Sequence, residues 1–369
     1  LGTALILFVV YLVMLYTATR QPLYVAAGLG GGSVAAVLAY HLFAHIQVRV
    51  AAWKDPFATY SDGGYQVAQS LFAIGTGSWF GMGLFQGLPD EIPVADTDFI
   101  FAAISEEMGL ILSLCLILVC VSCYVMFLNI ALALRNQFYK LVALGLGTCY
   151  IFQVFLNIGG VTKFIPSTGV TLPLVSYGGS SILSTMIMFG IIQGLYILRE
   201  DEEEIWKEER RELRNGTKRR TTKKKRQPKS QASKKFRNKE FAKMTYLFVT
   251  LFLALISYIV YFNVFRAKTI VNSPYNVRQD AFADRIIRGS ITDRDGEVLA
   301  ETQVGEDGTE NRVYPYGAAF AHVVGYSNET TGKSGLESIE NSELLTSNAF
   351  FAEKFLNEFK DEKIMAILS

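Results

Sequence analysis

Hydrophobic positions gather in six long runs, at residues 1–18, 22–46, 99–128, 140–163, 175–198 and 244–265. Each run approaches or exceeds the roughly 20 apolar residues that an α-helix needs to cross a bilayer. Inside hydrocarbon every backbone N–H and C=O must be hydrogen-bonded within the segment, so the runs are predicted to be helices. We therefore predict a mainly α, polytopic membrane protein with six transmembrane helices.

The hydrophobic pattern changes after residue 266. Between residues 288 and 302, apolar and polar side chains alternate around Asp295-Gly296. This dipeptide is typical of a β-hairpin with a two-residue type I′ turn. We expect residues 266–369 to form a small α+β segment outside the membrane.

Charge is scarce before residue 199 and dense after it, although the net charge is only +1. The segment 199–243 is strongly basic, and KRRTTKKKR (218–226) has seven Lys or Arg among nine residues. Because basic loops beside spans stay in the cytoplasm, this linker is predicted inside, with loop 47–98 and residues 266–369 outside. Contact with anionic lipid is favoured over nucleic-acid binding. We expect a helical extension over 199–214 and disorder over 215–240.

Carboxylates cluster where the third run begins. Asp96 and Asp98 precede it, and Glu106 and Glu107 lie inside it. Helix capping accounts for one of these acids, whereas acids inside a span usually face a polar cavity or a partner. Spacing alone leaves catalytic and structural roles equally open. The outer-loop cations available for ion pairs are Arg49, Lys54 and Lys163.

Two further stretches are rich in small or polar residues. Outer-loop residues 75–87 contain five glycines. A dinucleotide-binding loop would need a preceding strand, so tight packing or re-entrant backbone is favoured. SYGGSS (176–181) places hydroxyls and glycines at the mouth of the fifth run. Close helix packing and an anion site both remain open there.

Three stretches carry a resemblance to a known family. DPFATYSDGGYQVAQSLFAIGTGSWFGMG (55–83), TDFIFAAISEEMGL (97–110) and GVTLPLVSYGGSS (169–181) resemble the SEDS family of the RodA/FtsW type. The resemblance covers residues 1–198 and corresponds to the C-terminal half of that family's membrane domain. Since the first run begins at Leu1 without a Met, we expect the chain to be part of a longer protein.

The remaining chain resembles the start of a class B penicillin-binding protein. A span at 244–265 is followed by RGSITDRDGEVLAET (288–302) and GKSGLE (332–337). The resemblance implies a transmembrane anchor at 244–265 and a non-catalytic pedestal over 266–369. The Ser-x-x-Lys and Lys-Thr-Gly motifs of the transpeptidase domain do not occur in the sequence.

The SEDS resemblance implies a peptidoglycan glycosyltransferase that polymerises lipid II outside the cytoplasmic membrane and releases undecaprenyl pyrophosphate. It nominates Asp98, in TDFIFA, as the general base or as the ligand of a divalent cation, Mg or Mn, that Asp96 would help to hold. Asp96 stands where the family often has His, and its charge is expected to influence Asp98. The residues expected to bind substrate are Arg49, Lys54, Asp96, Thr97, Glu106, Glu107, Lys163, Ser176, Tyr177, Gly178, Gly179 and Ser180.

The expected partners are lipid II and undecaprenyl-linked glycan, membrane lipids, the fused penicillin-binding part and other elongation or division proteins, without nucleic acid. Two other functions stay open. A lipid II flippase would need charged groups deep in the spans, whereas these acids gather near the outer end. A scaffold, with its enzyme activity in parts outside this chain, is the third possibility.

Overall fold

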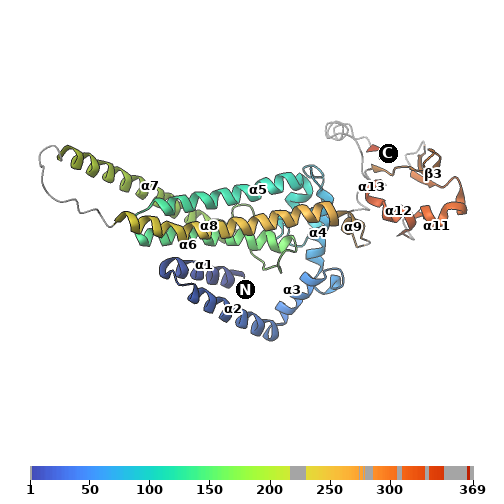
Figure 1. Ribbon diagram of the computed structural model, residues 1–369. Helices are drawn as coiled ribbons and strands as arrows, with labels where there is room; N and C mark the ends of the chain where they lie inside the picture. The colour runs from blue at the N-terminus through green and yellow to red at the C-terminus, as the bar shows by residue number, and fades with distance from the viewer. Residues whose placement is uncertain are drawn as a thin grey trace. The chain divides into compact units, whose positions relative to one another are not determined.

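The computed structural model describes residues 2–216, 230–273, 275–276, 278, 286–305, 310–328, 332–344 and 364–365. The chain divides into two compact units, Leu1–Phe262 and Asn263–Ser369. The first unit is helical (Figure 1). Its elements are α1 (Gly2–Thr19), α2 (Pro22–Leu42), α3 (Ala44–Lys54), η1 (Tyr60–Asp62), α4 (Tyr65–Gly77), η2 (Pro89–Glu91), α5 (Ile100–Ala133), α6 (Gln137–Val161), α7 (Gly179–Gly216) and α8 (Ser230–Tyr261).

Among the residues that the structure describes, six helices are long and apolar enough to cross a membrane, which agrees with the predicted number of spans. They are Gly2–Thr19, Pro22–Leu42, Ile100–Ala133, Gln137–Val161, Gly179–Glu204 and Glu240–Val271. The second span ends earlier than predicted because Phe43 adopts an extended backbone, with φ −120° and ψ 111°. The apolar run continues beyond that break into α3.

Helix α7 continues to Gly216, so the predicted helical extension over 199–214 is confirmed. Residues 215–216 belong to α7 and helix α8 begins at Ser230, so the predicted disorder is wrong for residues 215–216 and 230–240. A helix that already exists lengthens at little cost, because each added residue also adds a hydrogen bond. The rest of the predicted disordered segment, residues 217–229, lies outside the described residues.

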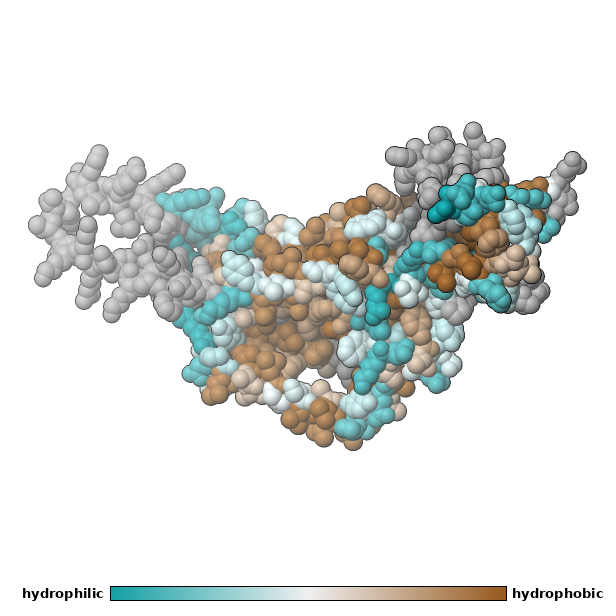
Figure 2. Space-filling model, turned by 45° about the vertical axis from the view of Figure 1, so that its right-hand side comes forward, coloured by the Kyte–Doolittle hydropathy of each residue, from teal (hydrophilic) through white to brown (hydrophobic). Residues whose placement is uncertain are grey.

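Apolar side chains cover much of the surface of the helical unit (Figure 2). Helix α2 has no buried residue, and Leu23, Val34 and Leu42 are each more than 60% exposed. A soluble protein rarely exposes so much contiguous apolar surface. The exposed faces of these helices therefore suit lipid or neighbouring membrane helices, as a multi-pass membrane protein requires.

Helix α8 packs against α5 and α6 through one stripe of buried side chains. Phe248 meets Tyr124 of α5 edge-to-face, with ring centroids 5.4 Å apart, and Phe252 meets Phe155 of α6 at 5.9 Å. The stripe advances by seven, four, three and four residues, which keeps it on one helix face. Its members are Phe241, Phe248, Phe252, Leu255 and Ile259.

Helix α5 is broken at Gly109, where φ is 79° and ψ is 175°. The segment 78–83 supplies the backbone partners that the break removes. Leu110 N donates to Ser78 O at 2.9 Å, and Ile111 N donates to Trp79 O at 3.2 Å. In the other direction, residues 82 and 83 donate to the carbonyls of residues 106 and 107, each at 2.9 Å. Irregular backbone in a membrane persists where such groups are paired by protein.

The second unit contains α9 (Ala267–Val271), β1 (Ile286–Ile287), β2 (Ile291–Thr292), β3 (Val298–Val304), β4 (Glu310–Val313), η4 (Gly317–Phe320), α11 (Ala321–Val324), β5 (Ser327–Asn328), β6 (Gly332–Lys333), α12 (Gly335–Ile339), α13 (Asn341–Leu344) and β7 (Ile364–Met365). A π-helical turn, Phe262–Arg266, joins α8 to α9. Strands β2, β3 and β4 form an antiparallel sheet, β5 pairs with β6, and β1 pairs in parallel with β7. These strands and short helices fit the expected α+β segment.

The β2–β3 hairpin is present, but its predicted two-residue turn is wrong. Asp293 N donates to Glu297 O at 2.9 Å, which leaves three residues in the loop. Of these only Gly296 has a positive φ, 88°, whereas a type I′ turn needs two such residues. The Asp293 carboxylate also accepts from the amides of Asp295 and Glu297, each at 2.9 Å. This side chain stabilises the longer loop.

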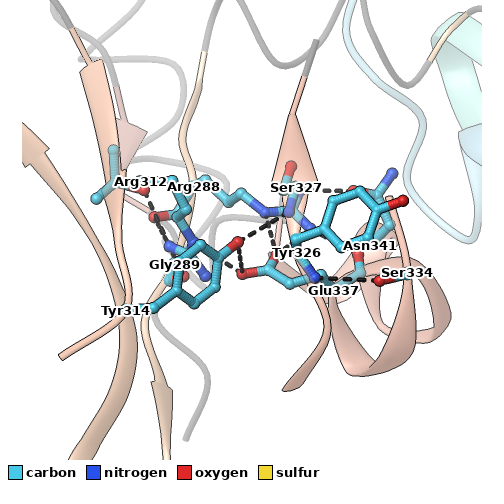
Figure 3. Close-up of polar contacts among 10 residues, drawn as sticks. Arg288, Gly289, Arg312, Tyr314, Tyr326, Ser327, Ser334, Glu337 and Asn341 are labelled. Carbon is cyan, nitrogen blue, oxygen red and sulfur yellow. Dashed lines mark hydrogen bonds and ion pairs between the residues drawn. The ribbon is translucent and has the colours of Figure 1, made fainter. Parts of the chain in front are cut away.

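Two arginines share one buried glutamate in this unit (Figure 3). Glu337 on α12 is 0% exposed. Its carboxylate accepts from Arg288 Nε at 2.7 Å and from Arg312 Nε at 2.9 Å. Arg312 also donates to Gly289 O at 2.7 Å. Burial lowers the pKa of Arg288, and the nearby Glu337 charge opposes that shift. The cluster ties α12 to β4 and to the segment before β2.

Candidate active site

A cavity of about 60 Å³ lies in the helical unit, where α5 begins and α6 ends. Its walls come from α3, the start of α4, the residues before α5, the last turns of α6 and the segment that follows α6. It brings together the predicted residues Asp98 and Arg49. The lining residues are Arg49, Ala52, Gly63, Gln66, Val67, Asp98, Phe99, Leu156, Asn157, Gly160, Val161, Ser167, Thr168, Gly169 and Val170.

Asp98 lies two residues before α5 and is half-buried. Thr97 Oγ1 donates to its Oδ1 at 2.9 Å, so the predicted site residue Thr97 supports this carboxylate directly. Phe99 is the N-cap of α5, and the cap makes no side-chain hydrogen bond. Capping therefore does not explain Asp98, and its carboxylate lines the cavity instead.

Arg49 extends from α3 toward the same place. Its Nη1 donates to Ser167 O at 3.2 Å. A Cβ on Gly169 would lie 3.4 Å from Asp98 Oδ2 and 3.5 Å from both terminal nitrogens of Arg49. Gly169 itself has a φ of 67°, which disfavours larger residues. The bare glycine thus lets a carboxylate and a guanidinium approach one small space.

Asn157 of α6, a residue not predicted from the sequence, holds these elements together. Its Nδ2 donates to Asp98 O at 2.8 Å and to Val170 O at 2.7 Å. Asn157 is only 3% exposed and lines the cavity. The available signal was an asparagine inside an apolar span, a polar group that usually has a specific partner there.

The predicted residues of SYGGSS lie beside the site but do not line the cavity. Tyr177 N donates to Asp96 O at 2.8 Å, which joins the segment before α7 to the segment before α5. Ser176 is buried, and its Oγ accepts from Leu172 N at 2.8 Å. Gly178 immediately precedes α7, which begins at Gly179. Gly179 and Ser180 are both exposed. Asp96 is exposed as well.

The other predicted charged residues are also outside the lining. Lys54 ends α3 and is exposed. Lys163 has a φ of 62°, and its carbonyl accepts from Trp53 Nε1 at 3.1 Å. Glu106 is 0% exposed, and its Oε1 accepts from Leu88 N at 3.3 Å. Glu107 is half-buried and accepts through its carbonyl from residue 83. Both glutamates therefore lie at the break in α5.

The predicted divalent cation has one lining carboxylate, Asp98. No group of three or more His, Cys, Asp or Glu that could hold a metal occurs among the residues that the structure describes. Mg²⁺ often binds through one or two carboxylates together with water and substrate phosphates. Cation binding by Asp98 and Asp96 stays a prediction.

Two family models match separate parts of the chain, and the first match ends close to residue 199, where charged residues become dense. Residues 1–200 match the FTSW/RODA/SPOVE family model, described as cell cycle protein. Residues 288–365 match the penicillin binding protein A dimerisation domain.

Individual relatives cover the first part of the chain. The peptidoglycan glycosyltransferase RodA of Mycobacterium tuberculosis is 43% identical over 52% of this chain and 41% of its own length. That of Mycobacterium leprae is 44% identical over the same shares. The probable peptidoglycan glycosyltransferase FtsW of Aliivibrio salmonicida is 36% identical over 52% of this chain and 49% of its own length. The chain thus spans about half the length of these relatives.

One solved structure, described as "Structural coordination of polymerization and crosslinking by a peptidoglycan synthase complex", also matches. It has a TM-score of 0.43 and 28% sequence identity, over 54% of this chain and 56% of that one.

Proposed function

Since the chain belongs to the FTSW/RODA/SPOVE family, we propose that its cavity forms part of a peptidoglycan glycosyltransferase site that polymerises lipid II. The observation that carries this proposal is the convergence of Asp98 and Arg49 on Gly169. A carboxylate beside a guanidinium suits a reaction that removes a proton from one substrate and expels an anion from another. The RodA and FtsW relatives are named for this activity.

In the proposed reaction, the Asp98 carboxylate takes the proton of the acceptor sugar hydroxyl. The acceptor oxygen forms a bond to the anomeric carbon of the donor sugar, and the bond from that carbon to the pyrophosphate breaks. The guanidinium of Arg49 stabilises the charge that develops on the leaving pyrophosphate. Asp98 then returns its proton to water.

The proposed membrane orientation puts this cavity outside the cell. Asp98 lies before α5, and the Arg135 amide after α5 bonds Glu202 of α7 at 2.8 Å, at the opposite end. Glu202 lies within the basic linker, and positively charged loops stay in the cytoplasm. Residues 199–243 are therefore cytoplasmic in this proposal, and residues 266–369 are extracytoplasmic.

The second unit is proposed to act as the pedestal of a class B penicillin-binding protein fused in cis. A tether raises the effective concentration of a partner and fixes a one-to-one ratio. Helix α8 supports this role, because its buried stripe already packs on α5 and α6.

The test is Asp98→Asn in the full-length protein, assayed for glycan polymerisation with purified lipid II. Asn retains an acceptor for the Thr97 hydroxyl but is not a base. We expect a loss of about 10²–10⁴-fold, whereas Asp90→Asn, an exposed carboxylate of the same outer loop, should retain activity. If Asp98→Asn polymerises lipid II at the wild-type rate, Asp98 is not the general base. Loss of lipid II translocation without loss of polymerisation would favour the flippase.

A further inference from the structure

The cavity contains two polar atoms that the proposed reaction does not use. Asn157 Oδ1 and Thr168 Oγ1 are both buried and have no hydrogen-bond partner among the described residues. Both residues line the cavity that holds Asp98. Buried polar groups in proteins are almost always paired, with protein, water or a ligand. Two such atoms in one cavity therefore indicate a group that binds there.

The orientation of the Asn157 side chain follows from its neighbours. Its Nδ2 lies 2.8 Å from Asp98 O and 2.7 Å from Val170 O. Both neighbours are carbonyl oxygens, which only accept, so the amide nitrogen must face them. Oδ1 is then left facing away from these carbonyls as a pure acceptor. Thr168 adds a hydroxyl that both accepts and donates.

The cavity has room for more than a single water molecule. Its volume of about 60 Å³ exceeds the roughly 10–15 Å³ of accessible volume that one water needs. Its polar wall combines the acceptors of Asp98 and Asn157 with the Thr168 hydroxyl, while Arg49 provides a cationic donor. That wall suits a ligand with hydroxyl or amide donors next to an anionic group.

We propose that Asn157 Oδ1 and Thr168 Oγ1 form a hydrogen-bonding subsite for a hydroxyl or an acetamido N–H of the acceptor amino sugar. This inference rests on the proposed glycosyltransferase function and deepens it. A sugar held there would have its reacting hydroxyl aligned with the Asp98 carboxylate, because the Asn157 amide also fixes the Asp98 backbone. In this proposal Asn157 binds the sugar through Oδ1 and positions Asp98 through Nδ2.

The test compares Thr168→Val with the wild type in the full-length protein. Valine keeps the shape of threonine and removes only the hydroxyl. We expect kcat/KM for lipid II to fall about 3–10-fold, the usual worth of one hydrogen bond. The melting temperature should not fall, because this hydroxyl has no hydrogen-bond partner in the part of the chain that the structure describes. Thr168→Ser restores the hydroxyl and should recover most of the lost kcat/KM.

The matched control is Thr17→Val. Thr17 is also buried, at 4% exposure, but its hydroxyl donates to Val13 O within α1 at 2.7 Å, outside the cavity lining. We expect this variant to keep the wild-type kcat/KM. If Thr168→Val also keeps it, the subsite proposal is wrong, whatever the outcome for Asp98. If the wild type does not polymerise purified lipid II, the proposed function itself fails, whereas polymerisation by Asp98→Asn removes only the assignment of Asp98 as the base.

A lipid II analogue with an acetoxy group in place of the acetamido group distinguishes the two donors. The analogue cannot donate from that position. If the acetamido N–H fills the subsite, wild type and Thr168→Val should use the analogue equally well. If a hydroxyl fills it, the wild type should keep its advantage over Thr168→Val.

Discussion

At the scale of single residues, Glu337 shows what a buried charge requires. It is 0% exposed and meets two guanidinium groups, with Arg288 Nη2 at 2.6 Å and Arg312 Nε at 2.9 Å. A buried ion pair adds little net stability, because desolvation offsets the attraction. Removing one partner is different, since the remaining charges stay buried without compensation.

Glu337→Gln should therefore destabilise the second unit by about 3–5 kcal/mol. Glu340→Gln is the matched control, because Glu340 pairs with Lys268 at 2.7 Å, where the Lys268 side chain is 55% exposed and that of Glu340 is 32% exposed. Such a surface pair contributes at most about 1 kcal/mol. Hydrogen exchange of the α12 amides in the full chain measures both changes. Equal protection in the two variants would contradict this account of the cluster.

Some residues of the cavity could be predicted from the sequence, and others could not. Asp98 and Arg49 were predicted, because charged groups at the ends of apolar runs are conspicuous and a family resemblance singled out Asp98. Asn157 was not predicted, since its importance depends on which two carbonyls meet its amide after folding. Glu106 and Glu107 were predicted to bind substrate, and they lie at the α5 break, outside the cavity lining. Substrate binding by them stays a prediction.

At the scale of elements, the break in α5 depends on close backbone approach. A Cβ on Gly109 would lie 2.5 Å from Phe80 C and 2.6 Å from Trp79 O. Gly81 has a φ of 82°, and a Cβ there would meet the backbone of Glu107 and Gly109. Two facing glycines thus let the segment 78–83 pair with the broken helix.

Gly109→Ala should destabilise the helical unit by about 2–5 kcal/mol, because it adds both a positive-φ strain and a clash with backbone. Gly190→Ala of α7 is the control, because a Cβ there would meet no described atom within 4 Å apart from the backbone of its own helix and its chain neighbours. In a helix interior this change should be neutral or stabilise by up to about 1 kcal/mol. Thermal unfolding in detergent compares them. Equal melting temperatures would show that the break tolerates a side chain.

The spans could be predicted because bilayer thickness sets the length of an apolar helix. The break in α5 could not, since one glycine in a long apolar run costs only about 1 kcal/mol in helix propensity. The glycines of residues 75–87 did predict tight packing, and Gly77 and Gly81 confirm it by their approach to α5. The hairpin was located correctly, but the Asp293 carboxylate lengthened its turn.

At the scale of the whole molecule, α8 links the family domain to the sequence that resembles a penicillin-binding protein. Near its start, Glu240 accepts from Tyr16 of α1 and pairs with Lys243 at 2.9 Å. Further along, Tyr258 and Phe164 have ring centroids 5.2 Å apart. Contacts near both ends of the span, together with the buried stripe between them, fix which face of α8 meets the other helices.

Phe252→Ala should weaken the packing of α8 on α6, because Phe252 is 1% exposed and its ring centroid lies 5.9 Å from that of Phe155. Truncating a buried Phe costs about 3–5 kcal/mol in soluble cores. Between membrane helices we expect about 1–3 kcal/mol, because lipid also solvates the exposed surface. Leu253→Ala is the neighbouring control, since Leu253 is 57% exposed.

The yield of cysteine crosslinking between α8 and α5 in membranes measures how closely the two helices stay packed. Phe252→Ala should lower the crosslinking yield between positions 248 and 124, whose rings touch in the wild type, while Leu253→Ala should not. If both variants crosslink equally, the stripe does not hold α8. Tethering alone, through the linker and the raised effective concentration it provides, would then keep the two parts together.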